Sequence, residues 1–155
     1  MAGRRELIKM TEAEVASYLA EQRVLNVATI GPTGHPHVVA MWFALVDGKP
    51  AFWTFAKSQK VLNLRRDPRI TALVESGETY SDLRGVELVG TARLVEDFDE
   101  VLAIGRAVGL KYQGDVVSSD DASAVLTAQA RKRLAVVIDV ERAVSWDHTK
   151  LRGGY

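Results

Sequence analysis

Basic and hydroxyl-bearing side chains gather in one short segment of the chain, residues 53–68. The side chains in it that could bind a ligand belong to Thr54, Lys57, Ser58 and Lys60. Thr54 ends a strand-like run, and Ser58 can cap a short helix that carries Lys60 in its first turn. The free amides at a helix start, the positive end of the helix dipole and nearby ammonium groups together suit a phosphate. The segment therefore has the composition of an anion site.

The same segment has a simpler interpretation. Exposed lysines around a short helix are usually solvated, and arginines near the helix end, here Arg65 and Arg66, often only complement the dipole. Spacing alone favours solvated side chains over a phosphate site.

Histidines are the other candidates for acid or base chemistry, and the chain has three: His35, His37 and His148. His35 belongs to a turn, where we expect it to be solvated. His37 and His148 could each donate a proton, because an imidazole titrates near neutrality. The chain has no cysteine, too few converging ligands for a metal, and no Ser-His-Asp triad or carboxylate pair that stands out. No catalytic residue is assigned from the sequence.

Turn residues divide the first third of the chain into a helix and three strands. The spacing of Thr11 and Glu14 predicts a capping box that opens a helix ending near Gln22. Three β-rich runs follow: Val24 to Ile30, His37 to Leu45 and Ala51 to Phe55. A loop of turn formers joins the first two runs, and Asp47-Gly48 predicts a tight turn into the third. The three runs therefore predict consecutive antiparallel strands.

The rest of the chain alternates between predicted helices and strands. The helix that Ser58 caps must stop before Pro68, because proline supplies no backbone donor. Further strands are predicted at Ile70 to Glu75, Val86 to Val95, Leu134 to Val140 and Ala143 to Trp146, and further helices at Asp97 to about Gly109 and at Ser119 to Ala130. About six strands joined mainly by short turns predict a closed or nearly closed antiparallel barrel.

The bulk composition limits the classes of partner. A length of 155 residues suits one domain, so we expect residues 1–155 to form a single unit. Twenty basic residues balance twenty acidic ones, which makes nucleic acid an unexpected partner. The opening lacks the apolar run of a signal peptide, and no stretch is long enough to span a membrane. We expect a cytoplasmic protein with no membrane partner.

Residues 53–68 resemble the phosphate-binding signature of the flavin-binding split barrels related to pyridoxamine-phosphate oxidase. That signature has an aromatic-Thr pair, a Ser-x-Lys whose Lys follows the Thr by six, and a helix ending in Asn/Asp-Pro. Trp53-Thr54, Ser58-Gln59-Lys60 and Asp67-Pro68 match it position by position. The order of elements matches over nearly the whole chain. The resemblance implies a mainly β (α+β) fold, a six-stranded antiparallel split β-barrel with flanking helices.

The resemblance also implies a set of cofactor contacts. Thr54, Ser58 and Lys60 would hold the cofactor phosphate, and the strand from His37 to Phe43 would lay its backbone along the ring system. Trp146 corresponds to a late tryptophan that packs beside the ring, often from the other subunit. The full set of expected cofactor-binding residues is His37, Val39, Met41, Trp42, Trp53, Thr54, Lys57, Ser58, Lys60 and Trp146.

Other segments are more similar to the actinobacterial branch of these proteins, which uses the deazaflavin coenzyme F420. The similar segments are residues 37–43, 63–69 and 145–151. Gln59 stands where the oxidase pattern carries an arginine, and the C-terminal Arg-x-His motif of the oxidases is missing. F420 carries a phosphodiester and an acidic glutamate tail, which Lys57 and the arginines near the helix end could meet. The resemblance thus implies F420 as cofactor, with FMN as the alternative.

The function that this resemblance implies is hydride transfer from reduced F420 to an unsaturated or conjugated organic acceptor, a small molecule. One alternative is an FMN-dependent oxidoreductase of the same fold. Another is a non-catalytic protein that binds a flavin, a deazaflavin or haem. Scarce catalytic side chains suit a cofactor enzyme, because the cofactor performs the redox chemistry and the protein supplies position and electrostatics.

The second strand also predicts a homodimer. Val39, Met41 and Phe43 would lie on one face of it, and the alternate residues Val38 and Trp42 on the other. A barrel strand with one wet face should instead alternate with polar residues. We therefore expect a homodimer, with the cofactor site at the subunit interface.

Overall fold

The hairpin predicted near the N-terminus forms over the whole length of its two strands. β1 (Val24–Ile30) runs antiparallel to β2 (Pro36–Trp42), with Val24 opposite Trp42 at one end and Ile30 opposite Pro36 at the other. This computed structural model describes residues 3–151. The other strands are β3 (Ala44–Val46), β4 (Lys49–Phe55), β5 (Arg69–Ser76), β6 (Arg84–Val95) and β7 (Arg133–Asp147). The helices are α1 (Arg4–Leu7), α2 (Glu12–Glu21), α3 (Gln59–Arg66), α4 (Phe98–Gln113) and α5 (Asp120–Ala130), with short 3-10 turns η1 (Tyr80–Asp82), η2 (Gly114–Ser118) and η3 (His148–Lys150).

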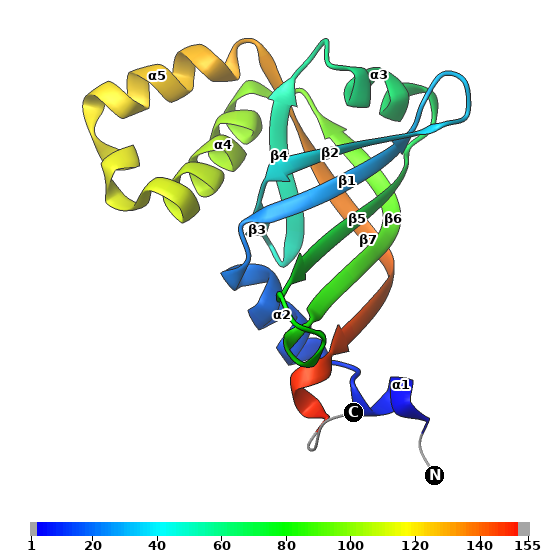
Figure 1. Cartoon of the computed structure of the whole chain (residues 1–155). Helices are drawn as coiled ribbons and strands as arrows, with labels where there is room; N and C mark the ends of the chain where they lie inside the picture. The colour runs from blue at the N-terminus through cyan, green and yellow to red at the C-terminus, as the bar shows by residue number, and fades with distance from the viewer. Residues whose placement is uncertain (1–2, 152–155) are drawn as a thin grey trace.

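Phe43 divides the run that the sequence predicted as one strand, His37 to Leu45. Its side chain is fully buried, and its backbone N–H donates to the hydroxyl of Tyr112 on α4 (3.1 Å). Before Phe43 the chain pairs with β1, and after it the chain pairs with β4. The sheet order is β2-β1-β5-β6-β7-β4-β3, so two strands that follow each other in the chain form opposite edges. Within residues 3–151, the curled half-barrel therefore has seven strands and not six, and its opening lies between β2 and β3 (Figure 1).

Local signals in the sequence are confirmed at several element boundaries. Thr11 and Glu14 form the capping box of α2, and Asp47 and Gly48 both have positive φ in the turn between β3 and β4. The two late strands are one continuous strand, β7, which contains an irregularity in its pairing with β6 next to Gly90. A β-bulge of this kind lets a long strand bend and stay paired, so the barrel wall can curve there.

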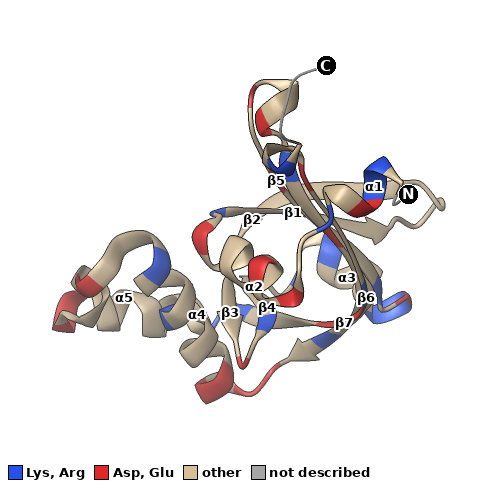
Figure 2. Ribbon diagram, turned by 90° about the horizontal axis from the view of Figure 1, so that it is seen from below, with Lys and Arg blue, Asp and Glu red and all other residues tan. Residues whose placement is uncertain are grey.

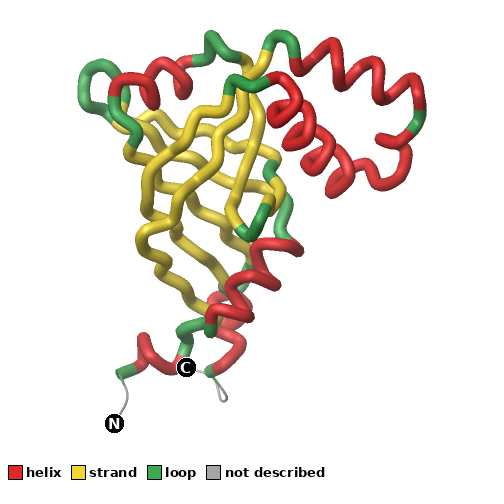
Figure 3. Tube along the Cα trace, turned by 180° about the vertical axis from the view of Figure 1, so that it is seen from behind, coloured by secondary structure: helices red, strands yellow, loops and turns green. Residues whose placement is uncertain are grey.

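Two apolar cores lie on the two sides of the sheet. The larger core fills the curl of the barrel and is closed by α2, which contributes Tyr18 and Leu19. The smaller core lies between the outer side of β4 and β7 and the helix α4. Figure 3 shows α4 and α5 as an arm beside the sheet, with α2 and α3 at opposite ends of the barrel. None of the helices in residues 3–151 is long and apolar enough to cross a membrane.

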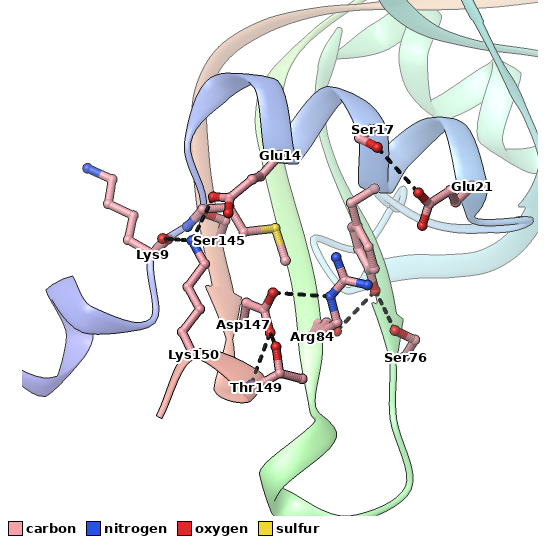
Figure 4. Close-up of polar contacts among 12 residues, drawn as sticks. Lys9, Glu14, Ser17, Glu21, Ser76, Arg84, Ser145, Asp147, Thr149 and Lys150 are labelled. Carbon is pink, nitrogen blue, oxygen red and sulfur yellow. Dashed lines mark hydrogen bonds and ion pairs between the residues drawn. The ribbon is translucent and has the colours of Figure 1, made fainter. Parts of the chain in front are cut away.

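A polar cluster joins the two ends of the chain at the α2 end of the barrel (Figure 4). Lys150 donates to the Glu14 carboxylate (2.6 Å) and to the Lys9 carbonyl oxygen (2.8 Å). Arg84 forms an ion pair with Asp147 (3.3 Å) in the same cluster. These contacts fix the end of β7, which carries Trp146.

The junction at Phe43 also places a positive charge in a partly buried position. The Lys111 ammonium lies 3.7 Å from the centroid of the Phe43 ring and donates to the Leu19 carbonyl oxygen (3.2 Å). Burial lowers the pKa of Lys111 to about 8, and the positive charge of Arg23 adds to the effect. The folded protein therefore releases this proton at a lower pH than the unfolded chain, whose lysines have a pKa near 10.4.

We predict that the free energy of unfolding rises with pH between about 8 and 10, because the unfolded chain still binds the proton that the folded chain has lost. The Lys111→Met variant should show a smaller rise, by about 1 kcal/mol, since the part-exposed ammonium is screened. Urea unfolding at pH 7.5 and pH 9.5 measures the difference. Lys132→Met, at an exposed lysine, should keep the wild-type rise. Equal pH profiles for wild type and Lys111→Met would contradict the prediction.

Candidate functional site

Helix α3 closes the end of the barrel opposite α2 and brings the predicted phosphate residues together. Asn63 donates to the Thr29 hydroxyl on β1 (3.0 Å), and on the other side Lys60 donates to the Thr54 hydroxyl on β4 (3.0 Å). Ser58 is the residue before the first turn of α3. Thr54, Ser58 and Lys60 are thus held at one place by contacts between α3 and two strands.

Lys60 is a buried cation without a counter-ion. Its side chain belongs to the buried face of α3 at 8% exposure, and within residues 3–151 no carboxylate forms an ion pair with it. Desolvation is what lowers the pKa of Lys60. Because a buried charge is unfavourable unless it is paired, an anion that reached this ammonium would be bound strongly.

Ser58, two residues before Lys60, adds an unused hydroxyl at the start of the same helix. It was expected to cap α3, but its side chain makes no capping hydrogen bond, and its Oγ is buried without a partner among the described residues. The first turn of α3 carries no acidic residue, and Figure 2 shows only basic charges on this helix. Buried polar atoms in folded proteins almost always have a partner. An unsatisfied hydroxyl, an unpaired ammonium and free helix amides together fit an anionic oxygen.

The other basic residues of the segment point elsewhere, with one exception. Arg65 pairs with Glu96, and Arg66 donates to the Ile30 carbonyl oxygen. Lys57 is exposed on the turn that leads into α3. Of these three, Lys57 is the one that lies next to the helix start.

The predicted cofactor strand is β2, at one edge of the sheet. His37, Val39 and Met41 are half-buried along one side of it, while Trp42 lies on the other side, exposed and stacked on the Tyr112 ring (4.4 Å between centroids). His37 lies opposite Thr29, the residue that α3 contacts, and the His37 Nδ1 is buried without a partner among the described residues. The start of this strand is therefore next to the α3 site.

Trp53 does not join Thr54, its neighbour in the signature. Successive residues of a strand point to opposite faces, so Thr54 faces the barrel end and Trp53 faces α4. The Trp53 ring packs against Gly105 so closely that a Cβ at that position would lie 2.6 Å from it. In this chain Trp53 belongs to the core beneath α4.

Trp146 lies at the far end of the sheet from α3. Its ring covers Gly85 at the start of β6, where a Cβ would lie 2.2 Å away. Ala92, further along β6, donates to the carbonyl oxygen of Pro68 after α3 (2.8 Å). At about 3.3 Å per strand residue, the two ends are roughly 23 Å apart. Within one chain, the structure does not bring Trp146 to the phosphate residues.

Of the other two histidines, His148 lies at the Trp146 end of the sheet and His35 lies in the loop that precedes β2. His148 is buried in the cluster beyond Trp146, and its Nδ1–H donates to the Tyr80 carbonyl oxygen (2.8 Å). His35 is exposed in the loop between β1 and β2.

Arg133 is a residue that the sequence analysis did not single out. It begins β7 opposite Phe55, and its guanidinium lies over the rings of Trp53 and Phe55. Its Nε is buried without a hydrogen-bond partner among residues 3–151. The pairing of β4 with β7 places it beside the turn that leads to α3, and nothing local in the sequence indicates that pairing.

Comparisons with known proteins agree with this architecture. The family model for pyridoxamine 5'-phosphate oxidase matches residues 11–147. Among curated proteins, none matches the chain. The conserved hypothetical protein Rv2991 of Mycobacterium tuberculosis is 42% identical, with a TM-score of 0.92 over 99% of this chain and 95% of that protein.

More distant solved structures share the fold. One is named F420 reductase, with 24% identity and a TM-score of 0.62 over 82% of this chain and 93% of its own. Another is the haem storage protein HutZ of Vibrio cholerae, with 18% identity and a TM-score of 0.66 over 86% of this chain and 94% of its own. The extent of the family match and the identity to the mycobacterial protein show that this chain belongs to the pyridoxamine 5'-phosphate oxidase family.

Proposed function

We propose that this protein is an oxidoreductase that binds coenzyme F420 and uses its reduced form to transfer a hydride to a small unsaturated or conjugated acceptor. The observation that carries the proposal is the buried Lys60 ammonium without a counter-ion, together with the unsatisfied Ser58 hydroxyl at the start of the same helix. A cofactor phosphate supplies the negative charge and the hydrogen-bond acceptors that these groups lack. When bound, the deazaflavin ring supplies the hydride chemistry, which no side chain of the site can supply.

The charge at the site favours a phosphodiester over a terminal phosphate. A phosphate monoester carries a charge of about −1.5 to −2 at neutral pH, whereas a diester carries a single charge. Lys60 is the buried cation beside Thr54 and Ser58, and Gln59 at the helix start donates to Asn63. A single ammonium matches the single charge of the F420 diester. The FMN monoester carries more than one negative charge, and solvent-exposed Lys57 would have to neutralise the part that Lys60 does not.

The fold alone does not determine the cofactor, because a protein named F420 reductase and a haem storage protein share this fold. The remaining possibilities are an FMN-dependent enzyme and a binding protein without turnover. Cofactor titration and turnover with the reduced cofactor separate these possibilities from the proposal.

We also propose that two copies of the chain associate through the outer face of the sheet. This face is apolar along β2, where the side chains of Val38 and Trp42 are 63% and 55% exposed. Trp146 faces the same side of the sheet at the end opposite α3, because its partner Gly85 alternates with the core residue Val86. In a two-fold dimer through this face, the α3 end of one copy would meet the Trp146 end of the other. Each cofactor would then contact both subunits.

The choice of cofactor is tested by titration at fixed salt. F420 should bind more tightly than FMN, because the site offers one buried positive charge. Fluorescence titration gives both dissociation constants, and oxidation of reduced F420 in the presence of quinones and enones tests turnover. Equal or reversed affinities would favour the FMN enzyme. Tight F420 binding without turnover on any acceptor would favour a binding protein.

The role of Lys60 is tested by Lys60→Met, which keeps most of the length of the unbranched side chain and removes its charge. Loss of a charge-assisted hydrogen bond should raise the F420 dissociation constant by roughly ten- to a hundredfold. Lys49→Met is the matched control, because Lys49 begins β4 next to the β3–β4 turn and forms an exposed ion pair with Asp139. If both variants bind F420 alike, Lys60 does not contact the phosphate.

A cofactor site that contains residues of both subunits is tested by mixing two variants that each bind F420 weakly. Lys60→Met and Trp146→Ala homodimers should each bind F420 weakly, but exchange of subunits should restore one intact site per heterodimer. After mixing, each heterodimer should therefore bind F420 tightly at one of its two sites, which titration measures. If the subunits are shown to exchange but tight F420 binding is not restored, Lys60 and Trp146 do not act in a site shared between two subunits.

The interface itself is tested by Val38→Glu, which should convert the dimer to a monomer in light scattering, because a charge would be buried in the apolar contact. Val125→Glu, at a similarly exposed valine on α5, should leave the dimer intact. A monomeric wild type at micromolar concentration would refute the dimer.

A further inference from the structure

Arg133 is held in one position by two aromatic rings. The central guanidinium carbon lies 4.6 Å from the centroid of the Trp53 ring and 4.7 Å from that of the Phe55 ring. A guanidinium that stacks on rings keeps its N–H edges free to bind a planar anion. Its Nε remains without a hydrogen-bond partner in residues 3–151. The side chain is therefore oriented, but its hydrogen-bonding capacity is not used.

Arg133 also resembles Lys60 in its electrostatic surroundings. Desolvation is the cause of the lowered pKa of Arg133, as it is for Lys60, and no carboxylate forms an ion pair with either residue within the described part of the chain. Among the described residues, several other basic side chains do form ion pairs, including those of Arg65 and Lys49. Two partly desolvated cations without counter-ions thus lie near the same end of the barrel.

A single turn connects these two cations. The Ser58 N–H donates to the Phe55 carbonyl oxygen (3.0 Å), and the Ala56 N–H donates to the carbonyl oxygen of Lys132 (3.2 Å), the residue before Arg133. Figure 1 shows the start of β7, this turn and α3 together at one end of the sheet. Strand alternation places Thr54 on the inner side of the turn, and Phe55 on the outer side with Arg133. A ligand whose phosphate reaches Ser58 and which continues over the turn would meet the exposed Phe55 ring and then Arg133.

We propose that Arg133 is a second anion contact, which binds a carboxylate or phosphate in the part of the cofactor that extends beyond its phosphate at Ser58. This rests on the proposed function, since it concerns the same site. Phe55 provides the surface along which the extension lies. Arg133 is then a residue that determines cofactor specificity: it favours a cofactor with an anionic extension over one that ends at the phosphate.

The first test compares F420, which carries an acidic extension, with FMN, which ends at its phosphate. Arg133→Met keeps an unbranched stem for packing on the two rings and removes the charge. It should weaken F420 binding about tenfold or more and change FMN binding less than twofold. Arg131→Met, two residues earlier and exposed at the end of α5, is the matched control and should change neither affinity. An equal loss for both ligands, or none for F420, would overturn the proposal.

The second test does not depend on the identity of the cofactor. Thermal unfolding is measured with inorganic phosphate and with tripolyphosphate, which extends the same anion. Wild type should gain more stability from tripolyphosphate than from phosphate, and Arg133→Met should lose the additional gain while keeping the phosphate gain. Lys60→Met should lose both. If wild type binds neither F420 nor FMN, the proposed function fails, whereas an unchanged tripolyphosphate gain in Arg133→Met refutes the role of Arg133.

Discussion

The architecture depends on the change of strand partner at Phe43. The Tyr112 hydroxyl accepts the Phe43 N–H and donates to the Arg23 carbonyl oxygen, so one side chain of α4 satisfies the backbone where the chain leaves one sheet edge for the other. A buried N–H without this partner would cost about 1–3 kcal/mol. Because β2 precedes the junction and β4 follows it, the junction sets the position of His37 relative to Thr54. Both halves of the candidate site therefore rely on a contact made far from the site.

Much of the fold could be predicted because its signals are local. A capping box, a turn with positive φ at Asp47 and Gly48, and a proline after α3 each act within a few residues. The break at Phe43 could not be predicted in this way. The strand pattern continues through it, and the chain changes partner only because an edge strand and a helix end are available there. The number of strands is a property of the closed sheet and not of the local sequence.

The site shows the same division between local and long-range information. Thr54, Ser58 and Lys60 lie together because one strand end, one turn and one helix are consecutive in the chain. Trp53 takes part in the other core because strand alternation separates neighbours, and Arg133 arrives through a pairing with Phe55. The burial of Lys60 without a counter-ion could not be predicted from the sequence either, because the prediction would require knowing which carboxylates lie near Lys60 in space. The unpaired charge lowers the stability of the empty protein, and a bound anion would offset that loss.

The insertion of α4 and α5 between β6 and β7 has a consequence for how the chain folds. These two strands form the longest ladder of the sheet, yet residues 96–132 separate them. Closing a loop of that length costs more entropy than forming the short hairpins β1–β2 and β3–β4. Contacts between residues near in sequence form sooner, so the helical arm can compact the loop before the ladder closes. Formation of α4 and α5 thus lowers the entropy cost of pairing β6 with β7. The position of this insertion therefore influences the order of the folding events.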